Sequence, residues 1–312
     1  MPDTSLPLRP RPCIGVSRCL RGDAVRYDGG HRRQTWLVER LAAFAELVPV
    51  CPEVAIGLGV PRPPIQLVRE ADGIHARGVE DPSQDVTEPL ARHARLQWNG
   101  QPALDGWIFK SRSPSCGVSG VPVFDPAGEP VAPGRGVFAA VIMAEQPLLP
   151  VVEEQQLDTA PGRDGFLERV FVYRHYRRWF ARGVTRERLE KFHHALRGHL
   201  LARGEAVRTR LERMVDRAGD PGELAPAYLQ DVMTVLGDPV RREGLALALE
   251  ALAREADAAP SVFSAIREYR AGLVDLQTVV RRLRNRPGRE PCLLLLPESA
   301  ELALRYGTAA GD

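Results

Sequence analysis

The hydrophobic pattern of the chain changes character near its midpoint. Before residue 146, short apolar runs alternate with segments in which apolar residues recur at helical spacing. After residue 165 only the helical spacing recurs, and the stretch between the two parts is rich in Pro, Glu, Asp and Gly. This pattern predicts two domains, an α/β domain over residues 1–150 and an all-α domain over residues 151–312.

The first domain contains four apolar runs that are typical of buried strands. They cover 14–17, 47–50, 107–109 and 137–143, and helical spacing is found over 35–47 and 86–96. Strands that alternate with helices predict a mostly parallel, Rossmann-like sheet. Ligands of such sheets bind at the carboxyl ends of the strands.

The second domain is predicted to be helical throughout. Thr185 is expected to cap one helix at its N-terminus, because a hydroxyl side chain there can accept a backbone N–H. The segment after residue 284, which contains Cys292, is expected to form a strand or a packing arm. The predicted helices cover 166–180, 186–203, 205–218, 226–236, 239–254 and 261–283.

Composition and cysteine content indicate a cytoplasmic protein. No apolar run reaches the roughly 18 residues that a membrane helix needs, and the first twelve residues lack the apolar segment of a secretory signal. The five cysteines are an odd number, which argues against a disulfide framework. Reduced thiols are therefore expected, either buried in the core or serving as metal ligands.

Three of these cysteines follow predicted strands. Cys19, Cys51 and Cys116 come after the first, second and third strands, so a parallel sheet would bring them to one edge. All three stand in polar, Gly- or Pro-containing loops, which suit a site better than a core. Three thiolates could hold zinc with one open position or a 4Fe–4S cluster with one free iron, and the residues alone leave both open, as well as buried core thiols.

Three segments around these cysteines resemble the thiouracil desulfidase family. They cover residues 17–31, 49–53 and 109–117. The resemblance implies a 4Fe–4S cluster on Cys19, Cys51 and Cys116 that acts as a Lewis acid without net redox change. It also implies that Glu53 transfers protons and that Ser113 activates substrate or positions water, although a turn-capping serine is the alternative. Cys13 does not match this pattern and is expected to be a buried thiol in a strand.

The second half resembles the YbgA-like helical domain that is often fused to this family. Residues 171–174 and 189–194 carry the likeness, and the fused proteins look like desulfidases of 4-thiouridine in tRNA. Arginine is dense from residue 163 to 217, which suits a polyanionic partner. We therefore expect replacement of sulfur by oxygen in 4-thiouridine of tRNA. The alternatives are a desulfidase of free thiouracil and a non-catalytic RNA-binding protein with zinc or a cluster.

Two groups of basic residues are candidates for binding phosphate. Arg26, Arg62, Lys110 and Arg112 lie near the cysteine motifs and could hold phosphate or simply be solvated. In the helical domain, a basic face is expected to combine Arg169, Arg174, Arg177 and Arg178 with cations of the helices that follow. These further cations are Arg186, Lys191, Arg197, Arg203 and Arg208. The histidines at 193, 194 and 199 are expected to serve helix packing.

Overall fold

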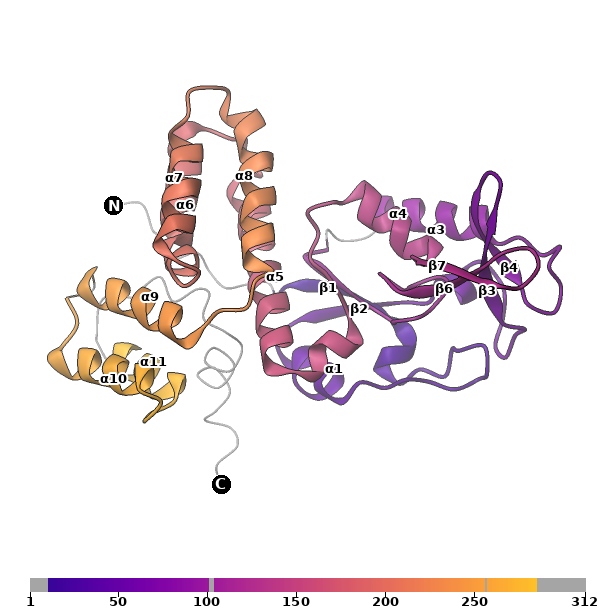
Figure 1. Ribbon diagram of the computed structural model, residues 1–312, viewed down its shortest axis with the longest axis horizontal. Helices are drawn as coiled ribbons and strands as arrows, with labels where there is room; N and C mark the ends of the chain where they lie inside the picture. The colour runs from indigo at the N-terminus through magenta and orange to yellow at the C-terminus, as the bar shows by residue number, and fades with distance from the viewer. Residues whose placement is uncertain (1–10, 101–103, 256, 285–312) are drawn as a thin grey trace. The chain divides into compact units, whose positions relative to one another are not determined.

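The computed structural model describes residues 11–100, 104–255 and 257–284 and divides the chain into two compact units (Figure 1). The first unit ends at Asp158 and the second begins at Thr159. Within the described residues, no helix has both the length and the apolar character to cross a membrane. The cytoplasmic location remains a prediction, and Cys292 lies outside the described residues.

The first unit is built on a four-stranded, fully parallel sheet in the order β2-β1-β5-β8. The predicted α/β class and parallel sheet are confirmed, as are strands β1 (Cys13–Ser17), β2 (Glu46–Val50) and β5 (Gly106–Phe109). The fourth strand is β8 (Val151–Glu153), which pairs with β5 through Trp107 and Val151. It lies in the segment where the sequence predicted the passage between domains.

The prediction of a strand over 137–143 is wrong. These residues form helix α4 (Val137–Glu145), which buries Val137, Phe138, Ala139 and Ile142. A short apolar run has no periodicity that separates a buried strand from a buried helix, and the two alanines within 137–143 favour the helix. Phe138 packs edge-on against Trp107 of β5, with ring centroids 5.5 Å apart, so α4 covers the sheet.

A second sheet of four strands was not predicted. Its order is β4-β3-β6-β7, with β3 and β6 parallel and the two outer pairs antiparallel. The strands are short and carry many polar residues, so their apolar runs are weak. Their bounds are β3 (Ile65–Glu70), β4 (Gly73–Gly78), β6 (Val121–Phe124) and β7 (Pro130–Gly134).

The helices of the first unit are short except for α3 (Thr87–Gly100), which agrees with the predicted 86–96. The predicted helix over 35–47 is only α1 (Thr35–Glu39), followed by a 3-10 turn, η2 (Leu41–Ala43), before β2 begins. Figure 1 shows α3 beside α4, where His93 stacks on Phe138.

Close packing in the centre of the parallel sheet β2-β1-β5-β8 requires glycine at position 15. A Cβ there would lie 2.6 Å from the Trp107 indole, inside van der Waals contact. The indole is almost fully buried and stacks on Phe109 with ring centroids 5.1 Å apart. This packing fixes β1 and β5, the two strands that lead into Cys19 and Cys116.

The second unit is helical over its described residues, as predicted. Thr185 caps α6 by accepting the Arg188 N–H, and the predicted helix over 261–283 is divided into α10 and α11. The helices are α5 (Ala160–Trp179), α6 (Arg186–Leu201), α7 (Glu205–Asp216), α8 (Pro221–Leu236), α9 (Arg242–Glu255), α10 (Pro260–Arg270) and α11 (Leu276–Arg284).

Aromatic residues form much of the core between α5, α6 and α8. The Phe192 ring contacts those of Tyr176, Phe180 and Tyr228 edge-on or nearly so. His193 shares a hydrogen bond with the Tyr228 hydroxyl at 2.8 Å, so its predicted packing role is confirmed.

Candidate functional site

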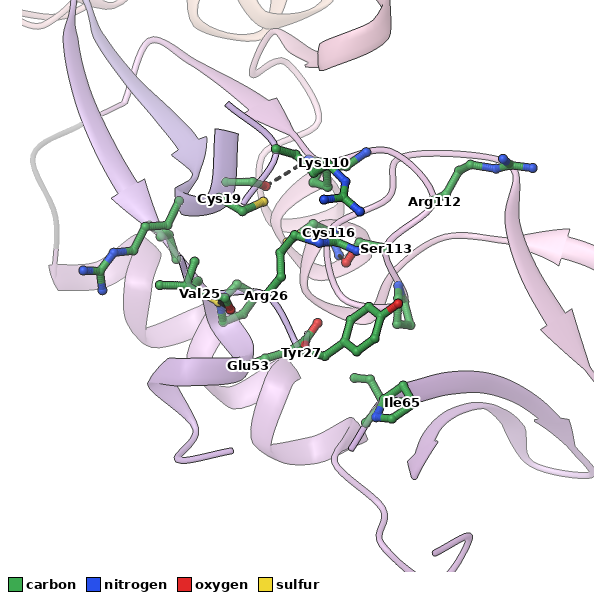
Figure 2. Close-up of a pocket in the computed structure, with 18 of the residues that line it drawn as sticks. Cys19, Val25, Arg26, Tyr27, Glu53, Ile65, Lys110, Arg112, Ser113 and Cys116 are labelled. Carbon is green, nitrogen blue, oxygen red and sulfur yellow. Dashed lines mark hydrogen bonds between the residues drawn. The ribbon is translucent and has the colours of Figure 1, made fainter. Parts of the chain in front are cut away.

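The carboxyl edge of the parallel sheet brings the three predicted cysteines to one cavity. Cys19 lies in the 3-10 turn η1 (Arg18–Arg21) directly after β1, and Cys51 follows β2 as the N-cap of helix α2 (Pro52–Ala55). Cys116 lies in the loop after β5. All three line a cavity of ≈ 550 Å³ (Figure 2). Cys13 is instead buried within β1, as predicted.

Burial and mutual proximity keep the three thiols protonated in the absence of a metal. Burial raises the pKa of Cys19 to about 11 and raises that of Cys116 well above its usual range. The charges of Cys19 and Cys51 also raise the Cys116 pKa. Each thiolate makes the ionisation of its neighbours less favourable. A cation that binds between the thiols stabilises all of them as thiolates, because its positive charge attracts the negative sulfur atoms.

The spacing of the thiols distinguishes between a single zinc ion and a larger cluster. Three thiolates on one tetrahedral zinc, each about 2.3 Å from the metal, would be about 4 Å apart. The three sulfur atoms, all in described residues, do not all lie within 4.8 Å of one another, so at least one pair is farther apart than that. In a cluster each thiolate binds a different iron, so wider spacing is required. The donor set therefore fits an iron–sulfur cluster better than zinc.

Helix α4 holds the Cys116 loop from one side. The N–H of Val137 donates to Pro114 and the N–H of Ala139 donates to Ser115, so the first turn of the helix binds loop carbonyls. A Cβ on Gly136 would lie 2.5 Å from the Ser115 carbonyl carbon, so only glycine permits this approach. The segment mistaken for a strand thus serves to position a candidate ligand.

Two successive carboxylates hold the same loop from the other side. Glu153, at the end of β8, accepts the N–H of Val118 at 2.7 Å. Glu154 opens the 3-10 turn η3 (Glu154–Asp158), accepts the Ser111 N–H at 2.6 Å and forms an ion pair with Lys110. Sequence reasoning missed both acids because they lie where a domain boundary was expected.

Glu53 is held by two residues that reach both of its carboxylate oxygens. Arg62 binds one oxygen through its Nε at 2.8 Å and a terminal nitrogen at 2.6 Å, and the Ser115 hydroxyl donates to the other at 2.7 Å. The Arg62 side chain is only 4% exposed and also donates to the carbonyls of Val25 and Gly59. Arg62 is therefore a buried partner of Glu53, which corrects its interpretation as a phosphate ligand.

Ser113 lines the cavity and also caps the loop that carries Cys116. Its hydroxyl oxygen accepts the N–H groups of Ser115 at 3.3 Å and Cys116 at 3.1 Å. These bonds use only the oxygen lone pairs, so the hydroxyl proton stays available to donate into the cavity. The turn-capping and functional interpretations of Ser113 are thus compatible.

The rest of the cavity lining carries several cations, of which Arg18 pairs with Asp23 while Arg26 and Arg32 both approach Asp28. Apart from Arg62, its lining includes five cations, and Glu53 is the only carboxylate among the lining residues. Lys110 is committed to Glu154, whereas Arg112 is exposed and has no carboxylate partner among the residues that the structure describes. The five cations are Arg18, Arg26, Arg32, Lys110 and Arg112.

Several cations of the predicted basic face in the helical unit have internal partners. Arg203 is buried and paired with Glu168, which also contacts His199, so it contributes no surface charge. Burial lowers the pKa of Arg169, and Arg208 is shared between Glu205 and Glu212. Lys191 and Arg197 pair with Glu187 and Glu255. Arg178 is exposed at the end of α5, and Arg177 lies over the Tyr173 ring.

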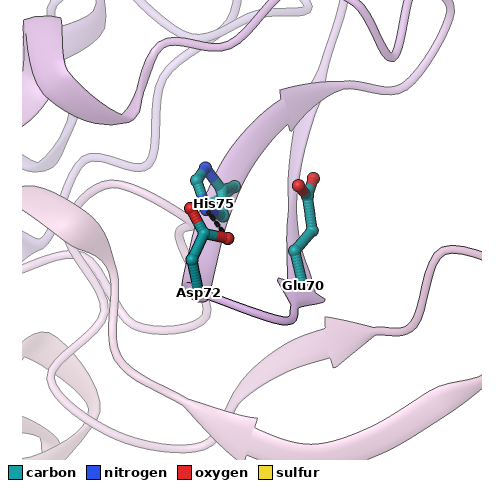
Figure 3. A group of neighbouring side chains, drawn as sticks. All are labelled: Glu70, Asp72 and His75. Carbon is teal, nitrogen blue, oxygen red and sulfur yellow. Dashed lines mark hydrogen bonds and ion pairs between the residues drawn. The ribbon is translucent and has the colours of Figure 1, made fainter.

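A separate group of potential ligands lies on the β3–β4 hairpin (Figure 3). Glu70, Asp72 and His75 approach one another there, but ion pairs account for the group. Arg77 binds Glu70 at 2.8 Å, and His75 bonds both Asp72 and Asp85. The hydrogen bond to Asp85 raises the pKa of His75. This network stabilises the hairpin and is not a candidate metal centre.

The fold and the cysteine site together define a class of protein, an α/β unit that gathers three thiols at the carboxyl edge of a parallel sheet. The sequence profile of the 2-thiouracil desulfurase family matches residues 14–154 of this chain. The matched segment contains all three lining cysteines, Glu53, Ser113, Glu153 and Glu154.

Two proteins similar to this chain each match slightly less than half of it. The uncharacterized protein YbbK of Bacillus subtilis (strain 168) is 29% identical over 151 residues, which span 46% of this chain and 97% of that protein. The solved structure of the [4Fe-4S]-dependent thiouracil desulfidase TudS is 33% identical and matches with a TM-score of 0.38. That match covers 47% of this chain and 94% of the TudS chain.

Proposed function

We propose that this protein replaces sulfur by oxygen in a thiolated pyrimidine, with a 4Fe–4S cluster held by Cys19, Cys51 and Cys116. The convergence of three thiols on one cavity, those of Cys19 and Cys116 buried and that of Cys51 half-buried, carries the proposal, and the dependence of TudS on [4Fe-4S] supports it. The net reaction is hydrolytic: the thiocarbonyl compound and water give the carbonyl compound and hydrogen sulfide, without oxidation or reduction.

The chemistry divides between the cofactor and the protein. A cluster bound by three thiolates supplies an iron with an open position, a Lewis acid suited to the soft sulfur of a thiocarbonyl. Glu53 serves as the proton-transfer group. A carboxylate has about four acceptor sites, and those that Arg62 and Ser115 do not use can accept a hydrogen bond from water or from a ring N–H of the substrate. Ser113 donates its free hydroxyl proton to the substrate or to the attacking water.

Iron and sulfide analysis of anaerobically reconstituted protein tests the cofactor. Ala at any of Cys19, Cys51 or Cys116 should abolish cluster binding, whereas Cys13→Ala, buried within β1, is the matched control and should keep it. Full iron loading in any of the three ligand variants would contradict the assignment.

Conversion of 2-thiouracil and 4-thiouracil, followed by sulfide release, tests the reaction. Glu53→Gln keeps the size of the side chain but removes its titrating group, so the rate should fall about a hundredfold or more, on the usual scale of acid–base catalysis, with the cluster intact. A loaded wild-type protein that releases no sulfide from any thiolated pyrimidine would refute the function.

A second candidate substrate is 4-thiouridine within tRNA, and the exposed Arg112 at the cavity favours it over an uncharged base. We propose that the cations around the cavity and at the C-terminal end of α5 bind RNA phosphates. Such binding must weaken as salt increases, and the reacting base must be extruded into the cavity.

A charge-reversal variant tests the RNA substrate. Glu at Arg174, Arg177 and Arg178 should weaken tRNA retention on filters while 4-thiouracil turnover persists. The control places Glu at Arg213, Arg217 and Arg267, which are exposed in the same unit and change the net charge equally. Equal tRNA binding by both triple variants would exclude this end of α5 as the RNA site.

A further inference from the structure

The cavity holds one exposed aromatic side chain for which the proposed reaction has no role. Tyr27 lies in the loop between η1 and α1 and is 43% exposed, although large apolar side chains elsewhere in the first unit are mostly buried. It is the only aromatic residue among those that line the cavity. Figure 2 shows its ring between Ser113 and Ile65, close to Glu53.

Two contacts hold Tyr27 in place. The Arg26 guanidinium lies over it, 5.3 Å from the ring centroid, and the Tyr27 carbonyl accepts the Arg62 N–H at 2.9 Å. Arg62 also binds the Val25 carbonyl and Glu53. One buried arginine therefore fixes the positions of both the Tyr27 loop and the proton-transfer group. A rigid aromatic surface costs little conformational entropy when a ligand binds to it.

We infer that Tyr27 is the stacking surface for the substrate ring, so that the cavity selects planar, aromatic thiolated heterocycles over saturated thioamides. This inference rests on the proposed function and specifies its substrate class. Stacking on an aromatic side chain suits any pyrimidine, because every base presents a π face. Pro64 and Ile65 also line the cavity and add apolar surface to it.

Uracil and 5,6-dihydrouracil provide the probes. They share the same carbonyl and N–H edge, but saturation of the C5–C6 bond removes the aromatic face. Equilibrium dialysis with the anaerobic, cluster-loaded full chain should show uracil binding about tenfold tighter than dihydrouracil, a difference of about 1.4 kcal/mol. Equal affinities in the wild-type protein would overturn the inference without any variant.

Two substitutions then assign the preference to the ring face. Tyr27→Leu keeps an apolar side chain without a π face and should bring the affinity ratio close to one, with iron content unchanged. Tyr27→Phe keeps the face and should preserve the ratio. A ratio retained in Tyr27→Leu, or lost equally in Tyr27→Phe, would overturn the inference.

Sulfide release by the wild-type protein separates the two proposals. If no thiolated pyrimidine is turned over, the proposed function fails and takes this inference with it. If turnover is seen and the affinity ratio does not depend on the Tyr27 ring, only the stacking role fails.

Discussion

Replacement of Arg62 by Met should destabilise the first unit strongly. The Arg62 side chain is 4% exposed and that of Glu53 13%, so their ion pair is largely shielded from water. Removing one partner of a buried pair typically costs about 3–5 kcal/mol, because the other charge stays buried without compensation. Since Glu53 retains some exposure and the Ser115 hydroxyl, we expect a loss of about 3 kcal/mol in the free energy of unfolding.

A double-mutant cycle separates the ion pair from the packing of the arginine. Arg62→Met leaves the Glu53 carboxylate without its partner, and Glu53→Gln removes that uncompensated charge. The double variant should therefore be about 2 kcal/mol more stable than the sum of the two single losses predicts. Trp179 is the only tryptophan after Asp158, so a Trp179→Phe background confines the fluorescence of urea unfolding to the first unit. Arg69→Met, at an exposed position of β3, the strand that follows the Arg62 loop, is the control and should change stability by less than about 0.5 kcal/mol.

Additive losses in that cycle would refute the reasoning, because they would show that Arg62 and Glu53 do not stabilise each other. A loss below about 1 kcal/mol for Arg62→Met alone would show that the pair behaves as an exposed one.

Two further predictions concern the Cys116 loop and the hairpin. Glu154→Gln removes charge-assisted bonds to Lys110 and Ser111, so this variant should lose iron to a chelator several times faster than the wild type does. Glu129→Gln, at an exposed position, is the control. Equal rates of iron loss in the two variants would show that Glu154 does not hold the Cys116 loop. His75 has a raised pKa in the folded state, so its bonds to Asp72 and Asp85 stabilise the hairpin fully below about pH 6.5 and fade as pH rises through the folded value. Hydrogen exchange of β4 amides should then be better protected at low pH after correction for intrinsic rates, and a pH-independent protection would exclude this role.

The sequence predicted the part of the site that follows from strand order alone. Buried apolar strands are visible as short apolar runs, and parallel pairing then places Cys19, Cys51 and Cys116 on one edge, where the structure has them. Position relative to a strand end is a local property, so it can be inferred without knowing the rest of the fold.

The supporting residues could not be predicted, because their roles depend on contacts between distant segments. Arg62 lies nine residues from Glu53 in a loop of ordinary composition, and nothing in the sequence shows that it is buried. Glu154 is 43 residues from Ser111, and the strand before it has only three residues. Helix α4 was mistaken for a strand because a buried apolar run fits either structure.

The position of β8 limits where evolution could have joined the two halves of this chain. This strand completes the sheet, and its last residue and the next one, Glu153 and Glu154, hold the loop that carries Cys116. A recombination event that exchanged the helical half at residue 150 would remove an edge strand together with the anchors of a candidate cluster ligand. A crossover after Asp158 would spare both, so viable gene fusions are expected to keep the first partner through this short segment.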